Sequence, residues 1–400
     1  MKRNKKIQPF YQKILKSRKD EVSQTSRGMA GSVRVRNLDD IKAIRKLDKS
    51  GVYDSIEQLP KQCLHAWEDT QNLVVPPSYR NVDKIVMTGM GGSGLGARVI
   101  ESVYGGKLKY PLVRINDYDL PDWVDEKTLV ICSSFSGTTE ETVENVRQAQ
   151  AKGAAWMVIA SGGTLIALAK KYRAPYYQII PTYNPSKQPR LAIGYSIIGQ
   201  LALAAKAGII NFTKNELLSC VETMEEVIEE AKVTRDTEND QAKKLAAKLW
   251  GKEIIFIAAR HLSAAAYTVK NQANENAKNF SASFDIPEFN HHFTEGLKFP
   301  KSNIKDLACL FLLSSLYPKR IQERMEITKE VVTNNKISVS VWKAKAKNPL
   351  SQAFEFIQFG GFVNFYLAML NGIDPAPVPW VDYFKIRLGQ PLGQWKTQKI

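Results

Sequence analysis

Two short stretches of the sequence end an apolar segment in glycines and hydroxyl side chains. Residues 87–98 read MTGMGGSGLGAR, and residues 131–141 read ICSSFSGTTEE. Glycine lets a backbone approach a ligand closely, and serine and threonine supply hydroxyl donors. Where a strand meets a helix N-terminus, free backbone N–H groups also favour an anion. We therefore predict a phosphate site, with these residues as its candidates: Gly92, Ser93, Ser134, Ser136 and Thr139.

Other ligands fit the first stretch less well. Gly89, Gly91 and Gly94 match the spacing G-x-G-x-x-G of dinucleotide-binding turns, but no lysine stands where a nucleotide P-loop needs one. Alone, the turn is equally well explained as a tight turn with a helix cap. Two serine-bearing turns about forty residues apart, each after an apolar strand, are a stronger signal than one.

The elements around these turns predict an α/β fold. Apolar segments at 84–90, 111–118, 128–134, 154–161 and 174–181 alternate with amphipathic segments at 93–105, 138–153 and 163–172. This order predicts a parallel sheet covered by helices on both faces, a flavodoxin-like or Rossmann-like αβα sandwich. Ligands of such sheets bind at the carboxyl ends of the strands.

The rest of the chain repeats this plan more loosely. We predict strands at 253–259, 281–288, 305–315 and 337–344, and helices at 261–278, 317–333 and 349–372. The helix at 349–372 is apolar enough for either a subunit interface or the interior. The predicted domains are a basic N-terminal extension at 1–40, a first domain at 41–215 and a second at 216–400.

The net charge of +16 is concentrated at the N-terminus. Residues 1–36 hold eleven Lys and Arg against two acidic residues, Asp20 and Glu21, which accounts for nine of the sixteen charges. We interpret this arm, with a short helix at 9–22, as a solvated extension rather than a nucleic-acid contact. Four scattered cysteines without a CxxC pair predict reduced core thiols, and no secretion signal is evident, so we expect a cytoplasmic protein. The uninterrupted apolar runs are too short to span a membrane.

The two turns resemble the sugar isomerase (SIS) domain, a fold that binds phosphosugars. The segments NPSKQPRLAIGYSI, NQANENAK, IPEFNHH and the C-terminal residues 357–389 extend the likeness. Together they are similar to bifunctional phosphoglucose/phosphomannose isomerases over roughly residues 50–390. The resemblance implies two SIS-type domains that isomerise hexose 6-phosphates through a cis-enediol intermediate, with no metal and no cofactor.

The resemblance also implies roles for particular residues. Glu275, in NQANENAK, matches the base that moves a proton between C1 and C2 of the sugar, and burial would raise its pKa toward neutrality. Arg190, in KQPRLAIG, matches the arginine that faces the enediolate charge. Without the resemblance, Glu275 would be interpreted as a surface carboxylate and Arg190 as a surface arginine of a loop.

Ring opening is implied for His291 and Lys385. His291 matches the family pattern PE-x-NH, whereas His292 has no match, and Glu288 is placed to orient the imidazole. In the family this histidine comes from a neighbouring subunit, so we expect an obligatory homodimer. Lys385, with Arg387 as a competitor, matches the C-terminal lysine that polarises the ring oxygen.

The sequence departs from the family at two places. Thr138 stands where the family motif has Asn. Where relatives that convert mannose 6-phosphate have a threonine, this chain offers Ala376 and Val378. We therefore expect the glucose reaction more firmly than the mannose reaction.

Two other functions remain open at this stage. One is an SIS isomerase of another phosphosugar, such as an aminosugar, and the other is a phosphosugar sensor without catalysis. A sensor would have no need for the four residues Glu275, His291, Arg190 and Lys385 together.

Overall fold

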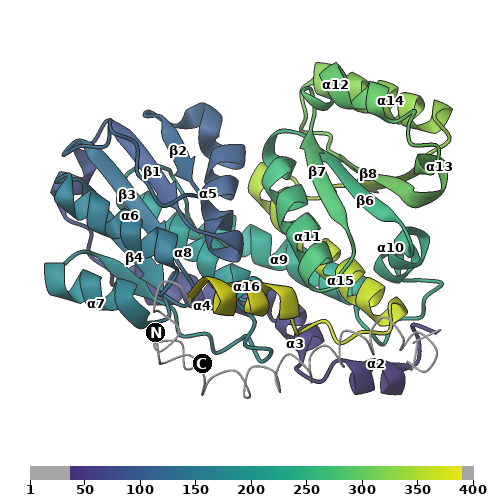
Figure 1. Ribbon diagram of the computed structural model, residues 1–400, viewed down its shortest axis with the longest axis horizontal. Helices are drawn as coiled ribbons and strands as arrows, with labels where there is room; N and C mark the ends of the chain where they lie inside the picture. Colours follow the sequence, from purple (N-terminus) through teal and green to yellow (C-terminus); the bar gives the residue numbers. More distant parts are fainter. Residues whose placement is uncertain (1–36, 390–400) are drawn as a thin grey trace, which may run out of the picture.

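The computed structural model describes residues 37–389 and contains two parallel sheets in an α/β arrangement (Figure 1). This confirms the predicted fold class. The predicted basic arm at 1–36, including its helix at 9–22, lies outside the described residues.

The first sheet has the strand order β2-β1-β3-β4-β5, with all pairs parallel. Its strands are β1 (Lys84–Thr88), β2 (Leu112–Ile115), β3 (Thr128–Ser133), β4 (Ala155–Ala160) and β5 (Tyr176–Gln178). β3 is buried along its whole length because helices cover both of its faces. The apolar runs in the sequence therefore correspond to true central strands.

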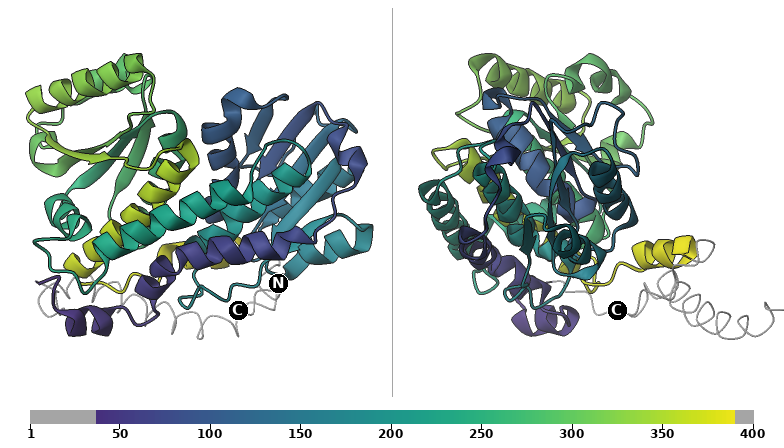
Figure 2. Two further views of the ribbon diagram at one scale, coloured as in Figure 1. Left: turned by 180° about the vertical axis from the view of Figure 1, so that it is seen from behind. Right: turned by 90° about the vertical axis from the view of Figure 1, so that its left-hand side faces the viewer.

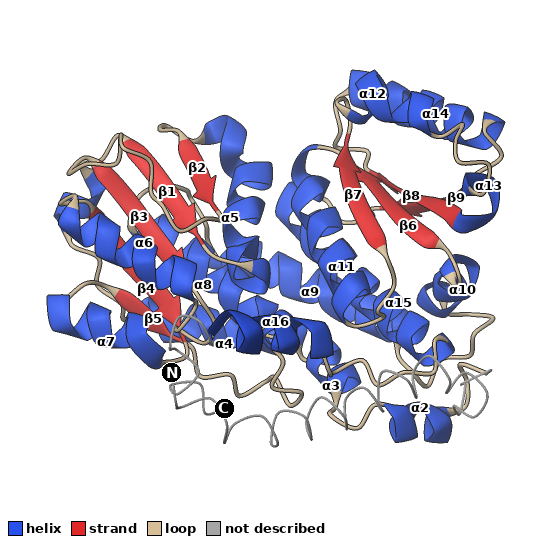
Figure 3. Cartoon of the chain, in the orientation of Figure 1, coloured by secondary structure: helices blue, strands red, loops and turns tan. Residues whose placement is uncertain are grey.

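Alternate residues of these strands point into two separate cores. In β3, Val130 and Cys132 pack with the helices α6 (Glu140–Ala151) and α7 (Gly163–Tyr172). Leu129 and Ile131 face the opposite side, where α8 (Ile193–Lys206) and α4 (Leu59–Gln71) pack. Figure 3 shows these helical layers on the two sides of the sheet.

The second sheet has the order β7-β6-β8-β9, again all parallel. Its strands are β6 (Glu253–Ala258), β7 (Ser281–Asp285), β8 (Leu307–Leu313) and β9 (Ser338–Lys343). The helices of this half are α9 (Lys214–Ala231), α10 (Gln241–Leu249), α11 (Ser263–Glu275), α14 (Lys319–Asn334) and α15 (Pro349–Leu370). The strands and the helices α11, α14 and α15 agree with the expected ones, whereas the sequence did not indicate α10.

Short elements complete the chain. The helices α2 (Ile41–Leu47) and α3 (Val52–Glu57) precede α4, and α16 (Pro379–Gly389) ends the described chain. Two further helices that the sequence did not indicate, α12 (Phe289–Gly296) and α13 (Asn303–Asp306), follow β7. The single helix expected after the first glycine turn is divided into a 3-10 turn (Gly91–Gly94), α5 (Leu95–Val99) and π turns (Ile100–Tyr104).

The helix α15 lies in the centre of the molecule. It is long and apolar enough to cross a membrane by length and composition, but 89% of its apolar window is buried inside the protein. It packs against α9, α10 and α11, as Figure 2 shows from behind. The structure thus assigns this helix to the interior rather than to an exposed interface.

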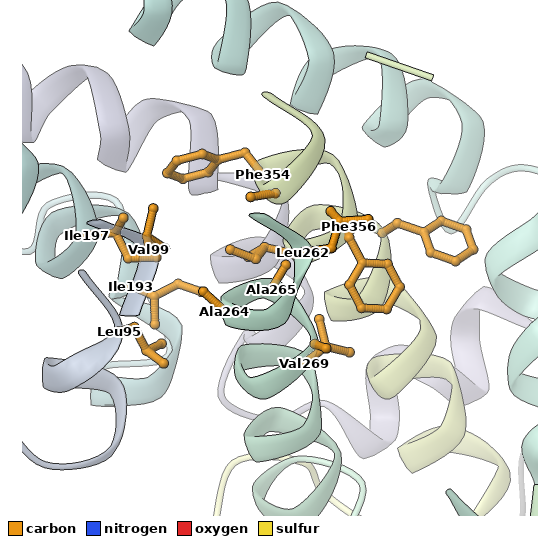
Figure 4. Packing of buried hydrophobic residues seen from close by; sticks show 14 of the residues in the cluster. Leu95, Val99, Ile193, Ile197, Leu262, Ala264, Ala265, Val269, Phe354 and Phe356 are labelled. Atoms are coloured by element: carbon orange, nitrogen blue, oxygen red, sulfur yellow. The ribbon is translucent and has the colours of Figure 1, made fainter. Parts of the chain in front are cut away.

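One apolar core runs through both halves. Leu95, Val99, Ile193 and Ile197 of the first half lie beside Leu262 and Ala264 of the second half (Figure 4). The N-terminal helix α3 packs against α15, although the two are far apart in sequence. The predicted division at residues 215 and 216 falls in the first turn of α9, a helix that packs on α4 as well as on α15. That division stays a prediction.

Candidate active site

The two predicted phosphate turns lie side by side. β1 and β3 are adjacent and parallel, so their carboxyl ends meet at one edge of the sheet. The Phe135 N–H donates to Ser93 Oγ over 2.9 Å and joins the two turns. The structure therefore brings together the glycines and hydroxyls that the sequence singled out.

Hydroxyl groups in the second turn are held by one another. Ser134 Oγ lies 2.7 Å from Thr139 Oγ1 and accepts from the Gly137 N–H at 3.1 Å. Gly137 has a φ of +69°, and a Cβ there would lie 1.9 Å from the carbonyl oxygen of Gly162. Ser136 is exposed and accepts from the Thr138 hydroxyl at 3.1 Å. Only glycine fits at 137, and the hydroxyl residues Ser136 and Thr138 of this turn are exposed.

The first turn rests against the segment that carries Arg190. A Cβ on Gly92 would lie 3.6 Å from the Arg190 Cα. The Ser196 hydroxyl donates to the carbonyl oxygen of Gly92 at 3.2 Å, and the buried Gln200 amide donates to that of Ser93 at 2.8 Å. Helix α8 thereby positions the glycine turn. Arg190 lies in the short turn Pro189–Leu191, just before this helix.

Arg190 links three separate segments of the chain and is 5% exposed. Its Nε donates to Asn276 Oδ1 at 2.5 Å, and its Nη1 donates to Gln188 Oε1 at 2.9 Å. Its Nη2 donates to the carbonyl oxygens of Pro375 at 2.8 Å and Ala376 at 2.6 Å. Among the described residues, these bonds use four of the five guanidinium N–H groups. One Nη1 N–H is left for a ligand.

Glu275 ends helix α11 next to this guanidinium. Its Oε2 lies 3.9 Å from Arg190 Nε, and its side chain is 33% exposed. Burial raises the pKa of Glu275, while the positive charges of Arg190, Lys278 and Lys385 oppose that rise. A carboxylate with a raised pKa, half-buried beside a fixed cation, has the properties of a general base.

Lys385 lies on the exposed helix α16, close enough for its charge to act on the Glu275 carboxylate. Arg387, the competing residue, is not among the charges that act on Glu275. The charge of Lys385 therefore reaches the Glu275 carboxylate, and the role of Lys385 in the reaction stays a prediction.

His291 lies elsewhere in the same chain. α11 ends at Glu275, β7 then runs five residues back along the sheet, and His291 follows on α12. Five strand residues span about 16 Å, and Figure 1 shows α12 at the top of the second half, whereas α16 lies below the junction of the two halves. His291 is exposed. Within one chain, His291 and Glu275 are therefore apart.

The expected role of Glu288 stays a prediction, and within one chain its side chain lies nearer to the neighbouring histidine. The carboxylate was expected to orient His291, but its Oε1 lies 3.8 Å from Nε2 of His292. The reason is helical spacing, because Glu288 and His292 are four residues apart at the start of α12 and so share one face of the helix.

Several polar residues of the site were missed from the sequence. Asn276 and Gln188 accept from Arg190, and the Lys278 ammonium donates to the carbonyl oxygen of Pro375 at 2.9 Å. Burial, and then the charge of Arg190, lower the pKa of Lys278 to about 8. All three lie inside the segments NQANENAK and KQPR, so their nearness to the matched residues was the available signal.

Residues 37–389 contain neither a candidate metal-binding cluster nor an exposed cysteine. No group of three His, Cys, Asp or Glu side chains in that range could hold a metal ion. Cys63, Cys132, Cys220 and Cys309 are all buried and unbonded, as predicted.

Comparisons with known proteins show the family to which the chain belongs. Residues 238–388 match the family described as the bacterial phospho-glucose isomerase C-terminal SIS domain. The bifunctional phosphoglucose/phosphomannose isomerase of Caldicellulosiruptor bescii is 34% identical over 85% of this chain and 99% of its own length. The chain belongs to the bifunctional phosphoglucose/phosphomannose isomerase family.

Two further comparisons are consistent with membership of this isomerase family. The bifunctional phosphoglucose/phosphomannose isomerase of Thermoplasma volcanium is 31% identical over 76% of this chain and 90% of its own length. A solved structure of a hypothetical protein from Thermus thermophilus has a TM-score of 0.68 at 18% identity. It covers 88% of this chain, and 94% of that protein is matched. At that identity the structural likeness shows the fold alone.

Ala376 is one of the two residues, with Val378, that the sequence offers where a threonine was expected for the mannose reaction. Ala376 is 2% exposed, and its carbonyl oxygen accepts from Arg190. Its backbone therefore supports Arg190, while the small side chain is turned into the protein.

Proposed function

We propose that this protein interconverts glucose 6-phosphate and fructose 6-phosphate, and mannose 6-phosphate and fructose 6-phosphate. The reaction proceeds by proton transfer through a cis-enediol. Relatives named bifunctional phosphoglucose/phosphomannose isomerase support this assignment over most of the chain. The cytoplasmic location expected from the sequence is part of the same proposal.

The pair formed by Glu275 and Arg190 is the observation that carries the proposal. A carboxylate with a raised pKa lies 3.9 Å from a buried guanidinium that keeps one free N–H among the described residues. In the proposed reaction Glu275 takes the proton from C2 or C1 of the open-chain sugar and returns it to the other carbon. Arg190 stabilises the negative charge on the enediolate oxygens, which exists only near the transition state.

The two serine turns hold the 6-phosphate in this proposal. Gly92 and Ser93 supply backbone and hydroxyl donors from one turn. Ser134, Ser136 and Thr139 supply hydroxyls from the other. Since Gly92 lies against Arg190, a phosphate bound there leaves the sugar carbons directed toward the Arg190 and Glu275 pair.

Ring opening is assigned to Lys385 and to His291 of a second subunit. Lys385 lies beside Glu275, whereas His291 of the same chain is at the far end of the second half. A neutral imidazole can both donate and accept a proton, as opening a cyclic hemiacetal requires. A homodimer would complete the site.

Exposed apolar side chains support such a dimer. Trp380 and Phe384 on α16, next to Lys385, are 69% and 63% exposed. Phe299 and Ile304, which follow the helix of His291, are 60% and 47% exposed. Large apolar side chains gathered near both halves of an incomplete site are typical of a protein interface.

A coupled assay tests the activity. Purified protein is given fructose 6-phosphate, and glucose 6-phosphate is followed through its dehydrogenase. Mannose 6-phosphate is then supplied in place of fructose 6-phosphate, with a phosphoglucose isomerase added to the coupling system.

Turnover of both substrates would support the bifunctional assignment and show that Ala376 and Val378 admit the mannose epimer. Turnover of the glucose pair alone would restrict the proposed activity to glucose 6-phosphate and fructose 6-phosphate. If the folded protein converts neither, the proposed reaction is wrong, and other phosphosugars, including aminosugar phosphates, become the substrates to screen.

A further inference from the structure

The turn at 374–376 connects the core helix α15 to the exposed helix α16. Its carbonyl oxygens receive donors from both halves of the molecule. Arg190 of the first half donates to Pro375 at 2.8 Å and to Ala376 at 2.6 Å. Lys278 of the second half donates to the same Pro375 oxygen at 2.9 Å. Two cations thus share one acceptor in this turn.

Helix α16 has little other support. Gly389 is its one buried residue within the described chain, and Trp380 is 69% exposed. A helix without a buried apolar face takes its position from its attachments. The turn at 374–376 is therefore the element that sets where α16, and with it Lys385, lies relative to Glu275.

Lys278 has a left-handed backbone conformation, which is unusual for a residue with a side chain. Lys278 has a φ of +50°, in the left-handed region that glycine adopts without cost and other residues disfavour. It lies three residues past the end of α11. Because lysine adopts an unfavourable backbone conformation here, the contacts of its ammonium group are the candidates that compensate for this cost.

Arg190 and Lys278 are also connected through Asn276, and acidic groups offset the repulsion between the two cations. Lys278 contacts the carbonyl oxygen of Asn276 at 3.4 Å, and Asn276 accepts from Arg190. The negative charges of Asp374 and Glu275 favour the charged ammonium. The Asp374 carboxylate in turn accepts from the Ala376 N–H at 2.9 Å and closes the turn. The clamp is thus a connected set of hydrogen bonds around one peptide.

We propose that Lys278 is a positioning residue which, with Arg190, clamps the turn at 374–376 and so holds Lys385 of α16 beside Glu275. Lys278 acts through the turn and need not touch the substrate. This inference rests on the proposed isomerase activity for its catalytic consequence, but the clamp itself has a readout that needs no substrate.

The test compares Lys278→Gly with Lys278→Arg. Glycine relieves the left-handed backbone and removes the ammonium, so the variant should melt no lower than the parent while losing the clamp. We expect kcat to fall about ten-fold or more with KM little changed, because misplaced groups cost rate while the phosphate turns stay intact. Amide hydrogen exchange over 379–389 should become faster in the substrate-free protein. Lys278→Arg, which keeps a donor, should restore most of both properties.

Lys336→Gly is the matched control. Lys336 also has a positive φ, of +60°, and is exposed at the end of α14. The substitution Lys336→Gly should leave both kcat and the amide hydrogen exchange of α16 unchanged.

Parental kcat and parental exchange of α16 in Lys278→Gly would overturn the proposal. A lower kcat with unchanged exchange would also overturn it, because Lys278 would then act on the substrate itself. If the parent lacks isomerase activity but α16 exchanges faster in Lys278→Gly, the clamp stands and the proposed function fails. If Lys278→Gly melts lower than the parent, Lys278→Met gives the same comparison without a new glycine.

Discussion

At the scale of single residues, Glu275 is the side chain whose environment says most about chemistry. It is half-buried, its pKa is raised by burial, and several cations surround it. Burial makes the carboxylate more basic, while the cations keep a usable fraction ionised near neutral pH. The same charges that moderate its pKa are available to stabilise an enediolate.

Glu275→Gln should abolish isomerisation, with a loss of at least about 10²–10⁴-fold in kcat, because general-base catalysis is removed. Binding of a hexose 6-phosphate, measured by calorimetry, should be nearly unchanged, since the phosphate turns do not include Glu275. Turnover within ten-fold of the parent would show that another group is the base.

The stability of this variant provides an internal control. Because the folded-state pKa of Glu275 is raised, the stability that this carboxyl contributes is complete below its ordinary pKa and is lost as pH rises through the folded value. Glutamine has no charge to bury. At pH 8 Glu275→Gln should therefore melt at or above the parent temperature, so a lost activity would not reflect unfolding.

The pH profile of kcat/KM should report the same carboxylate. Activity should fall as pH decreases through a pKa above the usual range for glutamate, because the base must be ionised. Lys385→Gln removes one of the charges that lower this pKa, so the acid limb of its residual activity should move to higher pH. Arg387→Gln, two residues away, should leave the limb in place. Equal shifts in both variants would contradict the placement of Lys385.

At the scale of elements, the site depends on turns that only glycine can form. Gly137 combines a φ of +69° with a carbonyl oxygen 1.9 Å from where a Cβ would lie. This turn carries Ser134, Ser136 and Thr139 at the carboxyl end of β3. Its shape therefore sets the positions of the hydroxyls together.

Gly137→Ala should raise KM for fructose 6-phosphate more than ten-fold and lower the free energy of unfolding by about 3 kcal/mol or more, since it combines a strained φ with a clash. Gly153→Ala is the matched control, because Gly153 has a φ of +70° and nothing within 4 Å of an added Cβ. It should cost only about 1–2 kcal/mol and leave KM unchanged. Urea denaturation and steady-state kinetics of both variants measure the difference. Similar KM values in the two variants would show that the turn at 137 does not shape the phosphate site.

At the scale of the whole molecule, the two halves share one core and meet at Arg190. Helix α15 is buried among helices from both sheets, so neither half presents a complete surface of its own. The proposed site is correspondingly composite, with the predicted phosphate turns in one half and Glu275 in the other. The proposed homodimer would add His291 of a second subunit.

Mixing two inactive variants tests the second subunit. If His291 acts across a dimer interface, Glu275→Gln and His291→Ala should each be inactive alone. After unfolding and refolding together, half of the dimers are mixed, and each mixed dimer holds one intact site, so activity should return to about a quarter of the parental value. A mixture that stays inactive, with dimers present by light scattering, would place both residues in one subunit or remove His291 from the reaction.

Much of the fold was predictable from local sequence. The strands β1, β3, β6 and β8 were recognisable because a buried parallel strand reads as a continuous apolar run. The 22-residue helix α15 could not be assigned to core or interface, because a helix that is apolar on all sides gives no preferred face. The helices α10, α12 and α13 were missed because each has nine residues or fewer, too few for a convincing apolar period.

The candidate site likewise has a part that was predictable from the sequence and a part that was not. The residue types and spacings of the sequence by themselves determined the α/β class, the phosphate turns and, through the family motifs, Glu275, Arg190 and Lys385. Only the tertiary structure decided that Arg190 bonds to Asn276 and Pro375, residues 86 and 185 positions away. It also decided that Lys278 shares the Pro375 oxygen and that His291 lies away from Glu275. Local sequence encodes backbone preference and apolar pattern, whereas such pairings depend on how helices and turns distant in the chain pack around a common core.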